Sequence, residues 1–278
     1  GDGFDGKVGD GNGFDNNRST PVEVEALGGS PFSEFTQVGA GVMHSCGLVD
    51  TGAIYCWGSD DYGNLGDSGA TGTSYSGVPT DDLPSGNPAV ELVVGGYHTC
   101  VTDSEGQPYC WGLNDYGQLG DGSVTDQNTP TEVYLDGISS LTNLAAGDTH
   151  TCGIADDGVA YCWGRNSYGQ LGIGSTVSQQ DPQAITLPSG VSAFVALSAG
   201  MYHTCGIADT GDAYCWGRRT YGGMGNGGGT TGNQTTPTAV TMPASVSFVA
   251  IGAGDYHTCA VGTDNNSYCW GRNSTYQL

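Results

Sequence analysis

The dipeptide Cys-Trp occurs five times at nearly constant intervals, and this period limits the folds open to the chain. The pairs begin at Cys56, Cys110, Cys162, Cys215 and Cys269, in steps of 54, 52, 53 and 54 residues. All five Trp, all ten Cys and all five His belong to this pattern. Such a period indicates stacked copies of one unit, each burying its apolar faces against its neighbours.

Each unit contains about four short strand-like segments separated by Gly, Asp and Pro turns. An apolar run ends in Gly, His-x-Cys follows, an Asp/Gly turn leads to Tyr-Cys-Trp-Gly, and a Pro-containing segment closes the unit. No segment shows the 3.6-residue apolar period of a helix. Short strands at this spacing predict an all-β protein, a β-propeller of four-stranded blades.

Three motifs carry a resemblance to a known family: Ala-Gly-x-x-His, Tyr-Cys-Trp-Gly, and the Tyr-Gly-Gln-Leu-Gly-Asp-Gly segment at residues 116–122. The units resemble the regulator of chromosome condensation repeat, in the Cys-rich form seen in secreted bacterial proteins. The resemblance covers nearly the whole chain and implies a β-propeller, usually of seven blades. This chain departs from that number, because it has five Trp-Gly units.

We expect one propeller domain, residues 1–278. The repeats are predicted at about 35–88, 89–141, 142–194, 195–247 and 248–278, the last completed by residues 1–34. Joined, the two chain ends would read Tyr-Gln-Leu-Gly-Asp-Gly, and residues 16–24 match the tail of a unit. These features favour a closed five-bladed ring, in which pairing removes exposed sheet edges. The alternative is part of a larger propeller.

The Cys residues form a Cys-x9-Cys pair in every unit, centred on the Asp/Gly turn. Facing residues of an antiparallel hairpin lie near disulfide reach, so one disulfide per blade is predicted. The predicted pairs are Cys46 with Cys56, Cys100 with Cys110, Cys152 with Cys162, Cys205 with Cys215, and Cys259 with Cys269. Such pairing indicates an oxidising compartment and an extracellular or cell-surface location. A zinc site using His-x-Cys is the alternative.

The five His are equivalent by position. They could form a ring around the propeller axis that binds a metal or an anion. Their recurrence in every unit favours a structural task, in which each His bonds a neighbouring backbone carbonyl. The repeated Tyr and Trp are expected in the core between blades.

The charge of the chain restricts its partners. Asp and Glu total 29 against 6 Lys and Arg, for a formal net charge of −23. Such a surface repels the phosphates of nucleic acids and anionic lipids. No apolar run approaches the ~20 residues of a membrane span. We therefore expect no nucleic-acid partner and no membrane insertion.

Two kinds of surface site are suggested by short polar motifs. The N-terminal oxygen-bearing side chains suit calcium, or else form solvated turns, and no other cofactor is expected. The candidate ligands are Asp2, Asp5, Asp10, Asn12 and Asp15. Asn17 and Asn233 begin Asn-x-Ser/Thr sequons in variable segments and are candidate glycosylation sites.

Function is expected in the variable loops, because the repeated residues serve every unit alike. The loops at 66–88 and 222–236 form the predicted partner surface, with Asp67, Tyr75 and Asn233 as candidate contacts. No catalytic motif is found, so the prediction is a non-enzymatic extracellular module. It would act as a structural or protein-interaction component of a cell surface, an appendage or a matrix, by binding a protein partner or by self-assembly. Alternatives are a secreted protein-binding inhibitor, an enzyme with a site at the channel mouth and, least favoured, nucleotide exchange on a small GTPase, which the resemblance offers.

Overall fold

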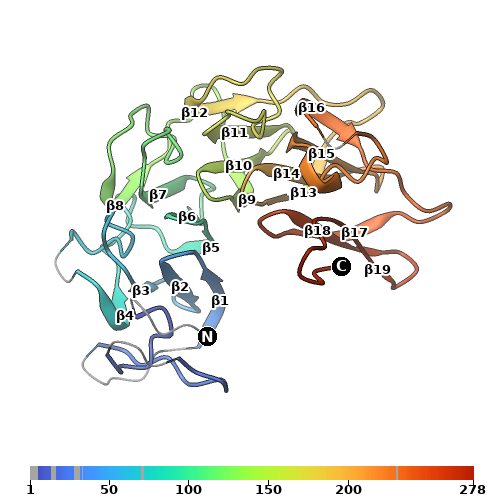
Figure 1. The fold of residues 1–278 in the computed structure, drawn as a ribbon. Coiled ribbons are helices and arrows are strands. Elements are labelled where there is room, and N and C mark those ends of the chain that lie inside the picture. Colours follow the sequence, from blue (N-terminus) through green and yellow to red (C-terminus); the bar gives the residue numbers. More distant parts are fainter. Residues whose placement is uncertain (1–5, 14–16, 28–31, 33, 70–71, 230) are drawn as a thin grey trace.

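The chain folds into five antiparallel sheets arranged side by side along an arc (Figure 1). The computed structural model describes residues 6–13, 17–27, 32, 34–69, 72–229 and 231–278. The described part contains strands and short 3-10 turns, among them η2 (Thr220–Gly222). The predicted all-β propeller architecture is therefore confirmed. The first sheet lies at one end of the arc and the fifth at the other (Figure 1).

Each of the first four blades contains four strands in sequence order, and the fifth contains three. Blade 1 comprises β1 (Phe35–Ala40), β2 (His44–Val49), β3 (Ile54–Gly58) and β4 (Ser74–Pro79). Blade 2 comprises β5 (Ala89–Val94), β6 (His98–Asp103), β7 (Pro108–Gly112) and β8 (Gln127–Glu132). Blade 3 comprises β9 (Leu141–Ala146), β10 (His150–Ala155), β11 (Ala160–Gly164) and β12 (Gln179–Ala184). Blade 4 comprises β13 (Phe194–Ala199), β14 (His203–Ala208), β15 (Ala213–Arg218) and β16 (Asn233–Ala239), and blade 5 comprises β17 (Phe248–Ala253), β18 (His257–Gly262) and β19 (Ser267–Gly271).

The central hairpin of each blade fixes the cysteine pairing. In blade 3, Cys152 of β10 lies directly opposite Cys162 of β11, and a turn closed by Gly158 joins the two strands. Gly158 has φ +82°, and a Cβ at this position would lie 2.3 Å from Ala193, so glycine is required there. The Cα atoms of the two Cys are 4.1 Å apart, as in a narrow, non-hydrogen-bonded pair of facing residues.

All five predicted disulfides are present. They join Cys46 to Cys56, Cys100 to Cys110, Cys152 to Cys162, Cys205 to Cys215, and Cys259 to Cys269. No free cysteine remains. A zinc site that uses these thiols is therefore ruled out, because no thiolate is available as a ligand.

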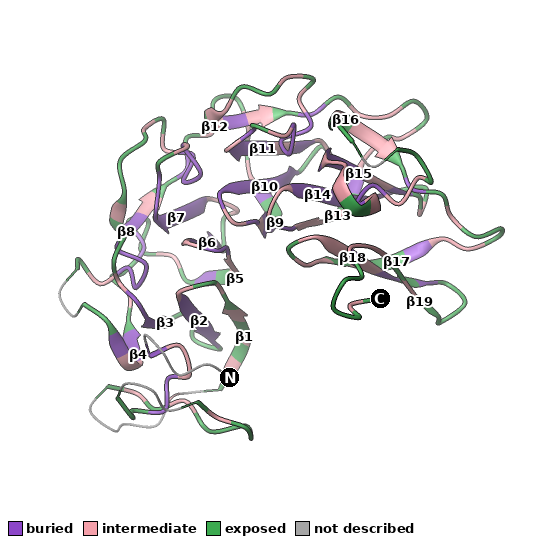
Figure 2. Ribbon diagram, in the orientation of Figure 1, coloured by how far each residue is buried: buried purple, intermediate pink, exposed green. Residues whose placement is uncertain are grey.

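The hydrophobic core is divided into clusters that lie between consecutive blades. The cluster between blades 2 and 3 contains Cys100 and Cys110 of blade 2 with Leu144 and Trp163 of blade 3. Trp163 is fully buried there. Figure 2 shows the buried residues concentrated in the central hairpins, with further buried stretches in the loops that follow them. Each of the first four disulfides thus forms part of the surface on which the next blade packs.

Residues 6–13 and 17–27 pack against blade 1 in the manner of the second half of a preceding blade. Gly9 donates its N–H to the carbonyl oxygen of Gly6 (3.0 Å) as Gly120 donates to Gly117 (3.1 Å). Trp57 donates its Nε1–H to the carbonyl oxygen of Lys7 (3.1 Å). Ala26 forms a parallel bridge with Gly77 of β4.

This arrangement differs from the predicted role of residues 1–34. The described part of that segment contacts blade 1, and the fifth sheet keeps three strands, so the closed five-bladed ring is not what the structure shows. The physical reason lies in residues 6–11, Gly-Lys-Val-Gly-Asp-Gly, which repeat the Gly-Gln-Leu-Gly-Asp-Gly pattern of 117–122. Gly9 lies so close to Trp57 that a Cβ would approach the indole to 2.8 Å. Trp57 holds this segment as each later Trp holds the loop of the blade before it.

Candidate functional site

The repeated polar residues form a lock between neighbouring blades. Nε2 of His98 in blade 2 lies 2.8 Å from Oγ1 of Thr151 in blade 3. The Thr151 hydroxyl donates to the carbonyl oxygen of Gln118 (2.8 Å), which also accepts the Nε1–H of Trp163 (2.9 Å). Because the hydroxyl proton is used on Gln118, Thr151 accepts from His98, which assigns that imidazole proton to Nε2.

The same contact recurs at four interfaces, with distances of 2.7 to 2.8 Å between Nε2 and the threonine hydroxyl. The pairs are His44 with Thr99, His98 with Thr151, His150 with Thr204, and His203 with Thr258. The structural role predicted for the histidines therefore holds for these four, but the partner is a side-chain hydroxyl of the next blade rather than a backbone carbonyl. Their rings are buried, so they do not form a ligand ring in the channel.

Burial keeps these imidazoles neutral. Loss of hydration lowers the pKa of His44 and His150 to about 3 and the pKa of His98 and His203 to about 4. A neutral imidazole can keep one N–H for the threonine without carrying a buried charge. The repeated His, Thr, Trp and Cys are thus engaged in holding the blades together, and a functional site is to be sought where the repeats differ.

Blades 3, 4 and 5 differ from blades 1 and 2 directly after the Trp-Gly motif. Arginine occupies this position in the last three blades, as Arg165, Arg218 and Arg272, whereas Ser59 and Leu113 occupy it in the first two. The change supplies three of the six cationic residues of the chain. It therefore creates a local feature that the repeat itself does not require.

Each of these guanidinium groups lies over two tyrosine rings. The Cζ of Arg165 is 4.8 Å from the centroid of Tyr116 and 5.7 Å from that of Tyr202. The Cζ of Arg218 is 4.9 Å from Tyr168 and 5.2 Å from Tyr202. These distances are within the range of cation–π attraction.

The Cζ of Arg272 continues the row, 5.4 Å from the centroids of both Tyr221 and Tyr256. The tyrosines also contact one another, with Tyr202 5.0 Å from Tyr168 and 6.0 Å from Tyr256 between centroids. We call this surface the arginine–tyrosine face. It consists of Tyr116, Arg165, Tyr168, Tyr202, Arg218, Tyr221, Tyr256 and Arg272.

The face lies at one end of the blades. Arg218 ends β15 opposite Asn233, the first residue of β16, and Tyr202 immediately precedes β14. The loop at 222–236, predicted as part of the partner surface, thus leads to the same end. Asn233 is exposed and donates its side-chain N–H to the carbonyl oxygen of Ser167 (3.3 Å).

The first predicted loop, 66–88, is only partly a loop, because it contains β4 (Ser74–Pro79). Tyr75 lies in this strand, and its carbonyl oxygen accepts the N–H of Gly11 (2.8 Å). Tyr75 is therefore a contact of the N-terminal segment rather than a loop tip. Asp67 lies in the preceding loop and is partly buried. The arginine–tyrosine row was missed in the sequence, although Trp-Gly-Arg in three consecutive units was a visible signal.

An acidic pocket of about 260 Å³ lies at the propeller axis, at the same end of the blades. It is lined by the glycine-rich ends of the innermost strands and by Asp148 and Asp255. Burial, and then the negative charge of Asp255, raise the pKa of Asp148 to about 6, while Arg165 acts in the opposite direction. The lining residues include no Ser, Thr, Cys, Lys or His, so the two carboxylates are the titratable side chains that line this pocket.

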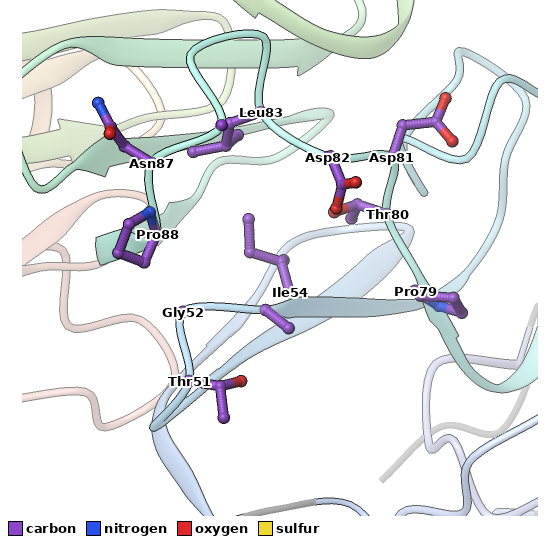
Figure 3. A pocket seen from close by; sticks show the side chains of 12 residues that line it. Thr51, Gly52, Ile54, Pro79, Thr80, Asp81, Asp82, Leu83, Asn87 and Pro88 are labelled. Carbon is purple, nitrogen blue, oxygen red and sulfur yellow. The ribbon is translucent and has the colours of Figure 1, made fainter.

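A second pocket, of about 550 Å³, lies at the opposite end of blade 1 (Figure 3). Its wall is formed by the β2–β3 turn at Thr51 and Gly52, by Ile54, and by the segment that leads into blade 2. Ile54, Leu83 and Pro88 give it an apolar floor, and Asp82 lies at the rim (Figure 3). The polar side chains of its lining are those of Thr51, Thr80, Asp81, Asp82 and Asn87.

The predicted calcium ligands are only partly within the described residues. Asp2, Asp5 and Asp15 lie outside them. Asp10 forms a salt bridge with Arg18 and accepts the N–H of Asn12 (3.3 Å). The carboxylate thus has partners within the chain, and no group of three or more His, Cys, Asp or Glu suited to a metal occurs in the described part of the chain. Calcium binding here, like glycosylation at the exposed Asn17 and Asn233, stays a prediction.

The five consecutive sheets, their interblade locks and the glycine-rich loops define the chain as a repeat-type β-propeller. It belongs to the RCC1-like domain family, whose sequence profile matches residues 1–278. The ultraviolet-B receptor UVR8 of Arabidopsis thaliana is 31% identical over 275 residues, which cover 98% of this chain and 60% of UVR8.

Two solved structures share the fold. Human WBSCR16 superposes with a TM-score of 0.76 at 22% identity, over 86% of this chain and 62% of that protein. Yeast RCC1 (Prp20), in its complex with Kap60, superposes with a TM-score of 0.76 at 22% identity, over 86% of this chain and 56% of that protein. The chain thus spans somewhat over half of these proteins. Among the described residues, no helix has the length and apolar character needed to cross a bilayer.

Proposed function

We propose that the chain is an extracellular, non-enzymatic module that binds a protein partner through its arginine–tyrosine face. The observation that carries the proposal is the break in symmetry at this face. The repeated side chains are used between blades, whereas the three arginines and their tyrosines are partly exposed at one end of the molecule. Arginine and tyrosine are enriched where protein interfaces form their strongest contacts.

Two further observations support a protein as the partner. The formal net charge of −23 disfavours nucleic acid and anionic membranes. Among the structural relatives, yeast RCC1 was solved bound to a protein, Kap60. A structural component, an adhesive component and a secreted inhibitor all require such binding, and they differ only in the partner.

The extracellular location is supported by the cysteines. All ten are in disulfides, and such bonds persist in oxidising compartments. Alkylation of the denatured protein, isolated directly from its source, is expected to label no thiol. Labelling of most units would overturn the proposed location.

The proposed binding face is tested by comparing two substitutions at opposite ends of blade 4. The wild-type protein is immobilised, exposed to the extracellular fraction of its source, and the captured protein is quantified. Tyr202→Ala removes the ring shared by Arg165 and Arg218 and is expected to abolish capture. Thr210→Ala, in the exposed β14–β15 turn, is the control and is expected to leave capture unchanged. Equal capture by both variants would show that another surface binds the partner.

A further inference from the structure

In the arginine–tyrosine face each guanidinium carbon lies over two tyrosine rings, and the described contacts leave most of the guanidinium N–H groups without a partner. Two rings lie within 6 Å of each Cζ, at distances of 4.8 to 5.7 Å. Stacking of this kind limits the rotation of a long side chain and so lowers the entropy lost on binding. The N–H groups, which lie in the guanidinium plane, can still be directed at a ligand.

These edges have few partners within the described residues. Arg165 and Arg272 each donate Nε–H to a serine hydroxyl two residues further along, at 3.4 Å and 2.7 Å. For Arg218, no side-chain hydrogen bond occurs in the described structure. The described ion pair is Arg18 with Asp10, and it lies in the N-terminal segment. The arginines of the face are therefore held by aromatic rings and not by carboxylates.

This lack of acidic partners is unexpected in a chain with 29 Asp and Glu residues and only 6 Lys and Arg. Asp148 in the axial pocket interacts electrostatically with Arg165. A planar guanidinium with free edges suits bidentate contact with a carboxylate. Three such groups on consecutive blades suit a ligand that carries several separated carboxylates.

The same surroundings discriminate between anionic ligands. A dense polyanion such as a nucleic acid would meet the field of a protein with a formal net charge of −23, together with Asp148 and Asp255 beside the row. An extended peptide with a few acidic side chains can place each carboxylate at an arginine and keep neutral residues near the axial pocket. The charge pattern therefore favours a peptide over a polymer of phosphates.

We propose that the three arginines bind the carboxylates of an acidic, extended segment of the partner protein, each guanidinium edge receiving one carboxylate. This inference rests on the proposed protein-binding function and names the chemistry of the partner. The tyrosines keep the guanidinium groups in position, and the spacing of the blades sets the spacing of the acidic residues.

The test uses a fluorescein-labelled 12-residue Gly/Ser peptide with a glutamate at every fourth position, and a second peptide with glutamines in their place. Binding is measured by fluorescence anisotropy at low and at physiological salt. We expect the glutamate peptide to bind and the glutamine peptide not to bind. Arg218→Gln and Arg218→Lys are each expected to weaken binding about tenfold, because lysine lacks the planar fork of donors.

Arg219→Gln is the matched control. It removes the same charge from the adjacent residue, which stacks on no tyrosine among the described contacts, and it is expected to change binding less than twofold. Arg165→Gln serves as a second variant if Arg218→Gln unfolds. If Arg218→Gln and Arg219→Gln weaken binding equally, net charge alone explains the attraction of the peptide, and the inference is overturned. So would no binding of the glutamate peptide at 1 mM, or stronger binding of a single-stranded oligonucleotide.

The outcome separates this inference from the proposed function. If Tyr202→Ala abolishes capture of a protein but the glutamate peptide neither binds nor competes, the face still binds a protein and the acidic segment is wrong. If the peptide binds through Arg218 but protein capture does not depend on Tyr202, the face binds acidic segments and the proposed protein-binding function of the face is wrong.

Discussion

Nε2 of His98 and Oγ1 of Thr151 lie 2.8 Å apart across the boundary between blades 2 and 3, and both atoms are buried. The hydroxyl connects the imidazole of one blade to the carbonyl oxygen of Gln118, which also receives the indole N–H of Trp163. One threonine thus couples two hydrogen bonds in a site without water access. Buried polar groups in such a chain depend on one another, because each loses its partner if the hydroxyl is removed.

Thr151→Val removes this hydroxyl while keeping the shape of the side chain. We expect a loss of about 1–3 kcal/mol in the free energy of unfolding, because His98 keeps a buried N–H without an acceptor. Urea denaturation measures the change. Thr142→Val, at an exposed position of β9, is the control and is expected to change stability little. A loss of equal size in both variants would contradict the role of the lock.

Acid is expected to weaken the fold through the buried histidines. Their pKa values are about 3 to 4 in the folded protein and 6.5 in the unfolded chain, so the unfolded chain binds more protons below pH 6.5. Stability is therefore full above pH 6.5 and falls with decreasing pH until about pH 3 to 4, by about 1.4 kcal/mol per pH unit for each of the four histidines.

Asp148 changes the stability of the fold with pH in the opposite direction to the histidines. Its pKa is raised to about 6, so its protonation favours the folded state as pH falls below 6. One partly exposed carboxyl offsets only part of the effect of four buried imidazoles. The urea midpoint, measured between pH 7.5 and pH 4.5, is expected to fall continuously below pH 6.5, and a constant or rising midpoint would contradict the prediction.

Removal of one disulfide is expected to cost more in blade 3 than in blade 5. Both loops have a sequence separation of 10, so the chain-entropy contribution is about 3 kcal/mol in each. Cys152 and Cys162 are fully buried in the cluster with Trp216, whereas Cys259 is partly exposed and Cys269 is exposed. Replacing both cysteines by alanine therefore leaves a cavity only in blade 3.

Denaturation of the two double variants measures this difference, and intact mass before reduction is expected to lie ten hydrogens below the reduced mass. Equal destabilisation of the two variants would show that packing around the inner disulfide contributes nothing.

Gly147→Ala is expected to disturb the interface between blades 3 and 4. A Cβ there would lie 2.4 Å from Cε1 of His150 and 2.5 Å from the carbonyl oxygen of Gly200 in the next blade. Overpacking of this kind costs about 1–3 kcal/mol. Gly252→Ala, on strand β17, meets no atom within 4 Å and is the control. Thermal unfolding compares the two, and equal stability would contradict the close approach of the blades at Gly147.

The sequence predicted those features that act within one repeat. The Cys-x9-Cys hairpin places Cys152 opposite Cys162 through local turn geometry, and the structure confirms all five pairs. Contacts between repeats were predicted less well. His98 was expected to bond a backbone carbonyl, but its partner is a hydroxyl more than 50 residues away, whose position depends on how neighbouring blades stack.

The site could be anticipated only in outline. The loop end of the blades was predicted as the partner surface, but the stacking of Arg218 on Tyr168 and Tyr202 joins residues from two blades and depends on their relative orientation. The position of residues 6–11 was recoverable in principle, since their glycines repeat a motif found in the loops. The motif does not specify which tryptophan the segment packs against, because that choice depends on how the blades stack.

Three indoles donate their N–H to the loop of the blade before them: Trp111 to Asn64, Trp163 to Gln118, and Trp270 to Gly223. The Trp216 indole lies close to Gly172 of the preceding loop, but its Nε1 has no hydrogen-bond partner among the described residues. The array is therefore directional. Damage to a loop should spread toward the C-terminal neighbour, whose tryptophan loses its acceptor, while the N-terminal neighbour keeps its own. An altered loop in one unit would thus be detected spectroscopically in the indole of the next.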